Sequence, residues 1–402
     1  MKILLVNPPQ KSVYTDSKVK EAVPFSPPLN LAVVSPALRQ NHEIKIFDGN
    51  IFDEVYRKLK DEITGFSPDY VGITFTTPLY DEMRKISDMA KEINPRITTV
   101  GGGAHASAMP VDTLRDSSLD MVVACEGDFA LSEIVGGKPL ESISGVFYKK
   151  DGKIRGNPPR EQIKNLDALP FPAWDLFEIK KYSSGELLSK KTPAGWLETS
   201  RGCVFRCAYC NKSVVTGIRI NGVDRELLDL MRKAGCYRVY YGIESGNQKV
   251  LDAIQKGITL DQVRKTVEMT REAGLEVFGF FMIALPGETE ASMTDTINFA
   301  KELDLDMAKM SVTVPLPATR LYETLESKGR IKTNVWSKYN LYSIPEDIYD
   351  PPGLTWDIVK KYYRRFYVEF YFRPSFIVKY AVKSLKQGSL LQDIKRLVNT
   401  RW

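Results

Sequence analysis

Histidine and cysteine are scarce in this chain, and long apolar runs are missing. Its 402 residues include two histidines and five cysteines. Five cysteines, three of them clustered, do not make a disulfide framework, and they indicate a reducing compartment. No stretch reaches the roughly 18 apolar residues that cross a membrane, and the first apolar run, residues 3–6, is too short for a secretory signal. The sequence therefore predicts a cytoplasmic protein.

The apolar content is high enough for large cores, and the charge is unevenly distributed. Hydrophobic residues make up 43% of the chain, and the length suggests two or three domains. The net charge is +6, yet residues 351–402 alone hold eleven lysines and arginines against three acidic residues. The excess positive charge is therefore confined to the C-terminal region.

Three of the cysteines stand at the spacing C-x3-C-x2-C: Cys203, Cys207 and Cys210. Thiolates are soft anionic ligands, and three of them can hold three irons of a [4Fe–4S] cluster. The fourth iron then stays open to a small molecule. Buried free thiols or a structural zinc site are the alternatives, but zinc needs a fourth ligand. The remaining candidates do not stand at motif spacing: Cys125, Cys236, His42 and His105.

Strands and helices alternate on both sides of this cysteine loop. The first part of the chain predicts strands at residues 3–6, 43–47, 70–75, 97–100 and 120–124, with helices at 29–39, 51–63 and from 77 onward. Further along, strands are expected at 196–199, 238–243, 277–283 and 309–314, with helices at 224–234, 261–273 and 290–303. Such alternation predicts parallel sheets whose ligands lie at the carboxyl ends of the strands.

Turn residues divide the chain further. Asp151-Gly152 between two short apolar runs predicts a hairpin, and prolines punctuate the sequence that follows it. Residues 145–192 therefore indicate a connector without a core of its own. The expected domains are residues 1–144, this connector, residues 193–330 and a helical region at residues 331–402.

The cysteine loop resembles that of radical S-adenosylmethionine (SAM) enzymes, because it follows a short strand and has an aromatic residue before its last cysteine. The resemblance implies that the three cysteines bind a catalytic cluster. Tyr209 would lie by the adenine of SAM, and Glu244 and Ser245 would hold its ribose and methionine parts. The turn beneath the adenine would comprise Leu285, Pro286, Gly287 and Glu288.

The loops of the first part resemble the cobalamin-binding domain found N-terminal to one class of these enzymes. The implied cofactor-binding residues are Asn7, Pro8, Pro9, Asp48, Gly49, Asn50, Gly101, Gly102, Gly103, His105, Glu126 and Gly127. Glycines at strand ends let a wide flat ligand lie against bare backbone. Where related domains place a cobalt-binding histidine, this chain has Asp48-Gly49-Asn50, so cobalamin is expected without histidine on cobalt. His105 is expected to bond the periphery of the cofactor or a backbone carbonyl.

Gly101 and Gly103 also begin a G-x-G-x-x-A sequence that ends at Ala106. This pattern can bind a dinucleotide when it follows the first strand of such a fold. Here it follows the fourth predicted strand, which argues against a nicotinamide cofactor.

The resemblance covers about residues 1–375 and predicts an α/β protein with a doubly wound Rossmann-like cobalamin domain, a partial (β/α) radical SAM barrel and a helical C-terminal tail. It implies a methyltransferase that acts on an unactivated carbon of a small molecule. Its cofactors would be a [4Fe–4S] cluster, SAM and cobalamin, with an external electron donor of the flavodoxin or ferredoxin type. The alternatives are a radical cyclase or ring-rearrangement enzyme, and a catalytically impaired cobalamin and iron–sulfur binding protein.

Aromatic and basic residues interleave over residues 360–373, and further lysines follow. A helix of this kind can lie in a membrane interface, which suggests a lipid or isoprenoid substrate and peripheral membrane contact. Alternatively, the aromatic residues pack on the barrel while the lysines face water. No known nucleic-acid module is present, so no nucleic-acid partner is expected.

The stretch after the last cysteine is short for this family. Thirteen residues separate Cys210 from the predicted helix cap at Asp224, whereas two strand–helix units of a barrel need roughly 60. The barrel is therefore expected to have four parallel strands instead of six. Either the two units are deleted, or the sequence as written omits a segment. The second explanation is favoured, because the flanking motifs are intact.

Overall fold

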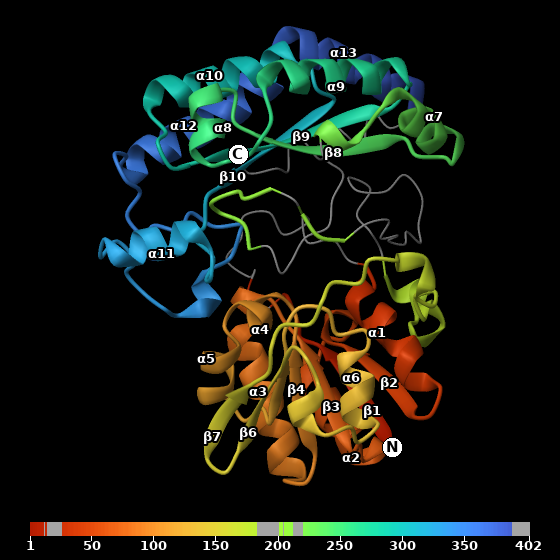
Figure 1. Ribbon diagram of the computed structural model, residues 1–402. Coiled ribbons are helices and arrows are strands. Elements are labelled where there is room, and N and C mark those ends of the chain that lie inside the picture. The colour runs from red at the N-terminus through yellow and green to blue at the C-terminus, as the bar shows by residue number, and fades with distance from the viewer. Residues whose placement is uncertain (12, 14–25, 183–200, 204, 212–219, 388–402) are drawn as a thin grey trace. The chain divides into compact units, whose positions relative to one another are not determined.

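The computed structural model describes the chain except residues 12, 14–25, 183–200, 204, 212–219 and 388–402 (Figure 1). The chain divides into two compact units. The first comprises Met1–Cys203, Asn211–Thr216 and Val335–Asn340, and the second comprises Val204–Cys210, Gly217–Asn334 and Leu341–Trp402.

A seven-stranded sheet forms the centre of the first unit, in the order β2-β1-β3-β4-β5-β6-β7. The strands β1 to β5 are parallel, as the alternation predicted. The strands are β1 (Lys2–Asn7), β2 (Glu43–Asp48), β3 (Tyr70–Thr74), β4 (Thr98–Gly102), β5 (Met121–Val123), β6 (Val146–Lys150) and β7 (Lys153–Gly156). The helices of this unit are α1 (Leu29–Arg39), α2 (Val55–Phe66), α3 (Tyr80–Ile93), α4 (Ala104–Ala108), α5 (Pro110–Arg115) and α6 (Ala130–Val135).

Helices cover both faces of this sheet. The sequence of β1 requires this, because the side chains in the middle of the strand are all apolar and point to both faces. Leu4 and Val6 point to the face that α2 and α3 cover. Ile3 and Leu5 point to the opposite face and pack with residues of α1 and α6. Since successive side chains of a strand alternate between faces, a continuous apolar run fits a strand buried on both sides. The expected doubly wound architecture is therefore present in this unit.

The hairpin expected in the connector belongs to this sheet. β6 pairs antiparallel with β5, and β7 pairs with β6. Further along, Phe177 and Tyr182 are buried in the same cluster as α1 and α6. The stretch after residue 144 thus extends the first unit and shares its core, which differs from the expected connector without a core.

The second unit contains a three-stranded parallel sheet in the order β10-β9-β8. Its elements are α7 (Arg225–Lys233), β8 (Arg238–Glu244), α8 (Gln248–Ala253), α9 (Leu260–Glu272), β9 (Glu276–Ile283), α10 (Glu290–Glu302), β10 (Met307–Val312), α11 (Arg320–Ser327), α12 (Trp356–Tyr371) and α13 (Pro374–Gln387). Each predicted strand and helix of this region that is described lies within a few residues of its expected bounds. The predicted strand at residues 196–199 lies outside the described residues.

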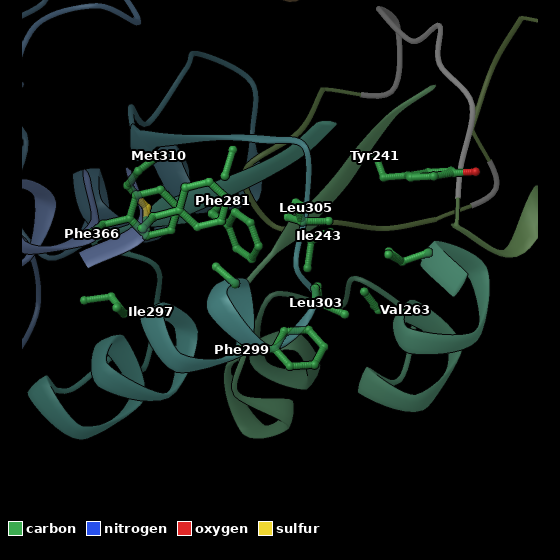
Figure 2. Packing of buried hydrophobic residues seen from close by; sticks show 14 of the residues in the cluster. Tyr241, Ile243, Val263, Phe281, Ile297, Phe299, Leu303, Leu305, Met310 and Phe366 are labelled. Carbon is green, nitrogen blue, oxygen red and sulfur yellow. The ribbon is translucent and has the colours of Figure 1, made fainter. Parts of the chain in front are cut away.

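Helices cover one face of this second sheet (Figure 1). Buried side chains alternate along each strand, and those of the covered face form one core with α9, α10 and α12. Figure 2 shows Tyr241, Phe281 and Phe366 within this core. The rings of Phe281 and Phe366 have centroids 5.5 Å apart, and both side chains are fully buried. The other face of the sheet is only partly buried along all three strands.

Two tyrosines of α12 cover the free edge of β10. The Tyr371 hydroxyl donates to the Ala308 carbonyl at 2.6 Å and accepts from the Ala308 N–H at 3.1 Å. The Tyr367 hydroxyl makes the same pair of bonds with Met310, at 3.1 and 3.2 Å. These hydroxyls satisfy edge groups that would otherwise offer a template for another strand. The aromatic residues of α12 therefore pack on the sheet. For this helix, that is the alternative to the membrane interface suggested by its aromatic and basic sequence.

Among the described residues, no helix has the length and apolar character needed to span a membrane.

Candidate functional site

Backbone bonds fix the second half of the cysteine loop. The Cys210 N–H donates to the Cys207 carbonyl at 3.1 Å. Between them, the Ala208 N–H donates to the Ile254 carbonyl at 2.9 Å, and the Ala208 carbonyl accepts from the Leu321 N–H at 2.8 Å. The turn is therefore anchored to the segment after α8 and to the start of α11.

The thiols of the motif fit an iron–sulfur cluster by their chemistry. Cys203, Cys207 and Cys210 are partly exposed, and none forms a disulfide. Cys203 belongs to the first unit, and the other two belong to the second. Within the described part of the chain, no three cysteine, histidine or carboxylate side chains gather closely enough to hold one metal ion. The cluster assignment therefore stays a prediction from the spacing and softness of the donors.

Glu244 lies at the carboxyl end of β8, where the pairing with β9 is irregular. Its φ of 70° is unusual for a residue with a side chain. Its Oε1 accepts from Nζ of Lys256 at 2.8 Å, and Tyr209 lies close enough for the charge of Glu244 to act on its phenol. Burial, followed by the charge of Glu244, raises the pKa of Tyr209, so the phenol stays a donor. A carboxylate has about four acceptor sites, so the Glu244 carboxylate can accept from Lys256 and from the two hydroxyls of a ribose.

Gly242 is what allows this arrangement. A Cβ at Gly242 would lie 2.6 Å from Oε1 of Glu244 and 3.2 Å from Nζ of Lys256. The carboxylate therefore lies over the bare backbone of Gly242, on the face of the sheet that the helices do not cover. The structure brings together the predicted Tyr209 and Glu244 and adds Lys256, for which the sequence offers no motif.

Ser245 does not share this arrangement. Its side chain is fully buried, and its hydroxyl contacts Oγ1 of Thr296 at 3.1 Å and accepts from the Asn247 N–H at 3.2 Å. This hydroxyl ties β8 to α10, and the contact of Ser245 with SAM stays a prediction.

A strained turn follows β9 at the predicted adenine site. Ala284 has φ 64° and Gly287 has φ 79°. The carboxyl of Glu288 holds the turn, because its Oε2 accepts from the Leu285 N–H at 3.0 Å. Its Oε1 is buried without a partner among the described residues. Burial raises the pKa of Glu288 to about 8, so this side chain is mostly a neutral acid at pH 7.

The first two strand-end loops of the first unit form one network around Asp48. Its Oδ1 accepts from the Asn7 side chain at 2.9 Å and from the Asn50 side chain at 2.8 Å. Its Oδ2 accepts from the Tyr182 hydroxyl at 2.9 Å. A Cβ at Gly49 would lie 2.9 Å from the backbone of Pro9. These predicted cofactor residues do come together, but much of their bonding capacity is used within the chain.

The glycines of the predicted cobalamin edge differ in their surroundings. A Cβ at Gly103, which has φ 101°, would lie 2.7 Å from the Phe75 carbonyl, and one at Gly101 would lie 2.6 Å from Leu119. These two glycines are required by packing within the sheet. By contrast, a Cβ at Gly102 would have no neighbour closer than 3.9 Å, and one at Gly127 none closer than 3.7 Å. Gly102 and Gly127 therefore leave bare backbone open to a ligand, which fits a cofactor at this edge.

His105 is enclosed by aromatic rings. Its centroid lies 5.0 Å from that of Tyr80 and 5.3 Å from that of Trp336. Its Nδ1 lies 3.2 Å from Oγ1 of Thr77, and Nε2 is buried without a partner among the described residues. Burial lowers the pKa of His105 to about 4. The imidazole is therefore neutral and contacts a threonine hydroxyl where a backbone carbonyl or cofactor edge was expected.

Glu126 takes part in an ion-pair cluster. Its Oε2 accepts from the Ile163 N–H at 2.7 Å, and its Oε1 lies 3.4 Å from Arg201. Arg201 also makes a bidentate pair with Asp128, at 2.8 and 3.0 Å. Glu126 thus holds the chain near the cysteine loop, a role the sequence did not reveal. The sequence alone does not predict this ion-pair cluster, because Arg201 and Asp128 stand far apart in the chain.

Two family matches cover much of the chain. Residues 19–135 match the B12 binding domain, and residues 211–300 match the radical SAM superfamily. The second match begins directly after Cys210. The two matches fall in the same order as the two predicted cofactor domains.

Three of the similar proteins have methyl transfer or cyclisation in their names. The uncharacterised methyltransferase PH0819 of Pyrococcus horikoshii is 32% identical over 94% of this chain and 94% of its own. The anaerobic magnesium-protoporphyrin IX monomethyl ester cyclase of Rubrivivax gelatinosus is 25% identical over 77% of this chain and 68% of its own. The solved radical SAM methyltransferase TsrM of Kitasatospora setae, which has cobalamin and a [4Fe–4S] cluster bound, has a TM-score of 0.64 at 17% identity. The alignment covers 81% of this chain and 75% of the TsrM chain.

These likenesses define the class: an enzyme with a cobalamin domain followed by a radical SAM domain. The chain belongs to the cobalamin-dependent radical SAM enzymes. The predicted family is confirmed, and with it the cofactors that define the family, namely cobalamin, SAM and a [4Fe–4S] cluster.

The comparison with the Pyrococcus protein also bears on the short stretch after Cys210. The alignment spans 445 positions, more than the 402 residues of this chain, so several tens of positions have no counterpart here. That size agrees with the predicted absence of two strand–helix units. The junction itself falls on residues 212–219, outside the described residues. Three parallel strands are described where four were expected.

Proposed function

We propose that this chain is a methyltransferase that acts on an unactivated carbon of a small molecule. The observation that carries the proposal is the group Tyr209, Glu244 and Lys256, which places an anchored carboxylate at a strand end behind the cysteine loop. Bound together, the cluster, SAM and cobalamin supply hydrogen abstraction and methyl delivery. Electrons would come from an external donor of the flavodoxin or ferredoxin type.

The residues of the chain bind and orient these cofactors. Glu244 accepts hydrogen bonds from the ribose hydroxyls of SAM, and the ammonium of Lys256 holds its carboxylate in place. Glu288 holds the turn that lies beneath the adenine. The bare backbone at Gly102 and Gly127 offers cobalamin a flat contact. His105 is enclosed by aromatic rings and contacts Thr77, so it would not serve as a metal ligand.

The reconstituted protein, supplied with cobalamin, SAM and dithionite, should release 5′-deoxyadenosine. With substrate and CD3-labelled SAM, we expect one S-adenosylhomocysteine per 5′-deoxyadenosine and a labelled product heavier by one methyl group, measured by mass spectrometry. A cyclised product without the label would point to the cyclase function that the Rubrivivax relative's name favours. A fully loaded cluster that yields no 5′-deoxyadenosine would point to a binding protein.

We further propose a lipid or isoprenoid substrate reached at a membrane surface. The support is α13, which exposes a stripe of apolar side chains between 46% and 63% accessible: Ile377, Val378, Val382 and Leu385. The opposite side of the helix packs inward through Phe376, which is buried. Lysines at positions 383 and 386, and further basic residues beyond, accompany this stripe in the sequence. An apolar helix face in a basic stretch of the sequence suits an anionic lipid surface.

The full-length protein should float with liposomes that contain anionic lipid at low salt. The double variant Val378→Glu/Leu385→Glu should not float with the liposomes, because two negative charges would replace apolar side chains that are proposed to enter the lipid surface. Leu230→Glu is the matched control, since Leu230 is 54% exposed on α7 and should not affect binding. Failure of the unmodified protein to float at low salt, or equal losses in both variants, would remove the proposal.

A further inference from the structure

The face of the β8–β9–β10 sheet that the helices leave uncovered has its own composition. The partly buried positions alternate along the strands, and they include Tyr240 on β8, Phe278 and Phe280 on β9, and Lys309 on β10. Register fixes their order across the sheet, because Phe280 pairs with Gly242 on one side and with Lys309 on the other. This face therefore carries an aromatic surface with a cation at one edge.

The aromatic surface is continuous. The rings of Phe278 and Phe280 have centroids 4.9 Å apart, and Tyr240 stacks on both at 5.1 and 6.0 Å. None of the three is fully buried. Partly exposed aromatic rings that face none of the described helices offer a planar contact for an apolar or flat molecule.

Lys309 has no ion pair with any described residue, although it is half-buried. Its Nζ lies 4.6 Å from the centroid of the Tyr342 ring. Burial lowers the pKa of Lys309, and no carboxylate opposes that shift. Near the start of the strands the same face holds Arg238, whose charge is neutralised by Glu276 at 2.8 Å. A ring face attracts an ammonium but does not cancel its charge, so Lys309 lacks the anion that Arg238 has.

We propose that Lys309 and the rings of Phe278 and Phe280 form a substrate subsite that takes an apolar or planar molecule with a carboxylate or phosphate group. The anionic group would bind the ammonium of Lys309 while the body of the molecule lies on the rings. This inference rests on the proposed function, because it assigns the substrate class of the same sheet face that holds Glu244.

SAM carries a carboxylate too, and the geometry separates the two sources of anion. The carboxylate of Glu244 lies over Gly242, on β8. Lys309 is on β10, with β9 between them, and two strand spacings amount to roughly 10 Å. The lysine thus lies on the described strand farthest from the predicted ribose contact. The proposal therefore assigns it to the substrate, and a SAM titration tests the alternative that it binds the carboxylate of SAM.

The test titrates phenyl phosphate and 4-phenylbutyrate into the full-length reconstituted protein, with 4-phenylbutanol as the neutral match, by calorimetry. The unmodified protein should bind the two anions at least about tenfold more tightly than the alcohol, the range of a charge-assisted hydrogen bond. Lys309→Met should lose that preference, and Lys309→Arg should keep most of it. Lys265→Met, an exposed lysine of α9, should match the unmodified protein.

A SAM titration of the same variants separates the outcomes. Unchanged SAM affinity in Lys309→Met, together with lost anion preference, supports the subsite. An unchanged anion preference in that variant, or a loss of SAM affinity as large as the loss for the probes, overturns it. Release of 5′-deoxyadenosine by the unmodified protein tests the proposed function separately, so the failure of one is not read as the failure of the other.

Discussion

Replacing any one of Cys203, Cys207 or Cys210 with alanine should abolish cluster binding and the release of 5′-deoxyadenosine. A [4Fe–4S] cluster with three protein ligands cannot be held in place by two. The unmodified protein, reconstituted without oxygen, should bind about four irons per chain and absorb visible light. Each variant should fall close to the background in iron content, in visible absorbance and in the electron paramagnetic resonance of the reduced sample.

The two other cysteines supply the controls. Cys125 is exposed, and Cys236 donates its thiol to the Arg238 carbonyl at 3.3 Å. Cys125→Ala and Cys236→Ala should retain full iron content, because neither thiol belongs to the motif. Zinc in place of iron in the unmodified protein, or iron loss in the control variants, would contradict the assignment of the three ligands.

Stability should fall as the pH rises from about 5 to about 8, and Glu288 should be a major cause. Burial raises the pKa of Glu288 from 4.5 to about 8, so the folded chain holds a proton that the unfolded chain releases. The stabilisation is fully present below pH 4.5 and is lost as the pH rises through 8. A single group contributes at most about 1.4 kcal/mol per pH unit, so the loss is on the order of 4 kcal/mol.

The variant Glu288→Gln isolates this contribution. Its amide oxygen can still accept from the Leu285 N–H, and it does not titrate. The variant should therefore show a smaller fall in the free energy of unfolding between pH 5 and 8, measured with urea at each pH. Glu290→Gln, at an exposed position two residues on, should leave the pH dependence as it is. A Glu288→Gln profile that runs parallel to that of the unmodified protein would falsify the assignment.

Much of the fold could be predicted because the apolar pattern determines it locally. The unbroken apolar run of β1 indicates a strand buried on both faces, and α1 was expected at its observed bounds. Asp224 was expected to cap the helix that follows it, and it accepts from the Leu227 N–H at 2.8 Å. Loops at strand ends then bring Asn7, Asp48 and Asn50 together without further information.

What the sequence did not reveal depends on contacts between distant residues. Lys256 pairs with Glu244, and Arg201 pairs with Asp128, but neither basic residue belongs to a motif. Ser245 carries the right chemistry for a ligand, yet its hydroxyl faces Thr296 in the core. Whether a polar side chain serves the fold or a ligand is decided by its neighbours in space, which spacing along the chain does not report.

The first unit is completed by residues from late in the chain. Trp336 and Tyr339 lie in its segment Val335–Asn340, and the ring of Trp336 lies against His105. During synthesis the strands β1 to β5 leave the ribosome long before this segment does. Domains usually fold as they emerge, but here the aromatic enclosure of His105 can close only after most of the second unit has been translated. The nascent first unit therefore carries an unfinished apolar surface for most of the time that the ribosome needs to make the protein.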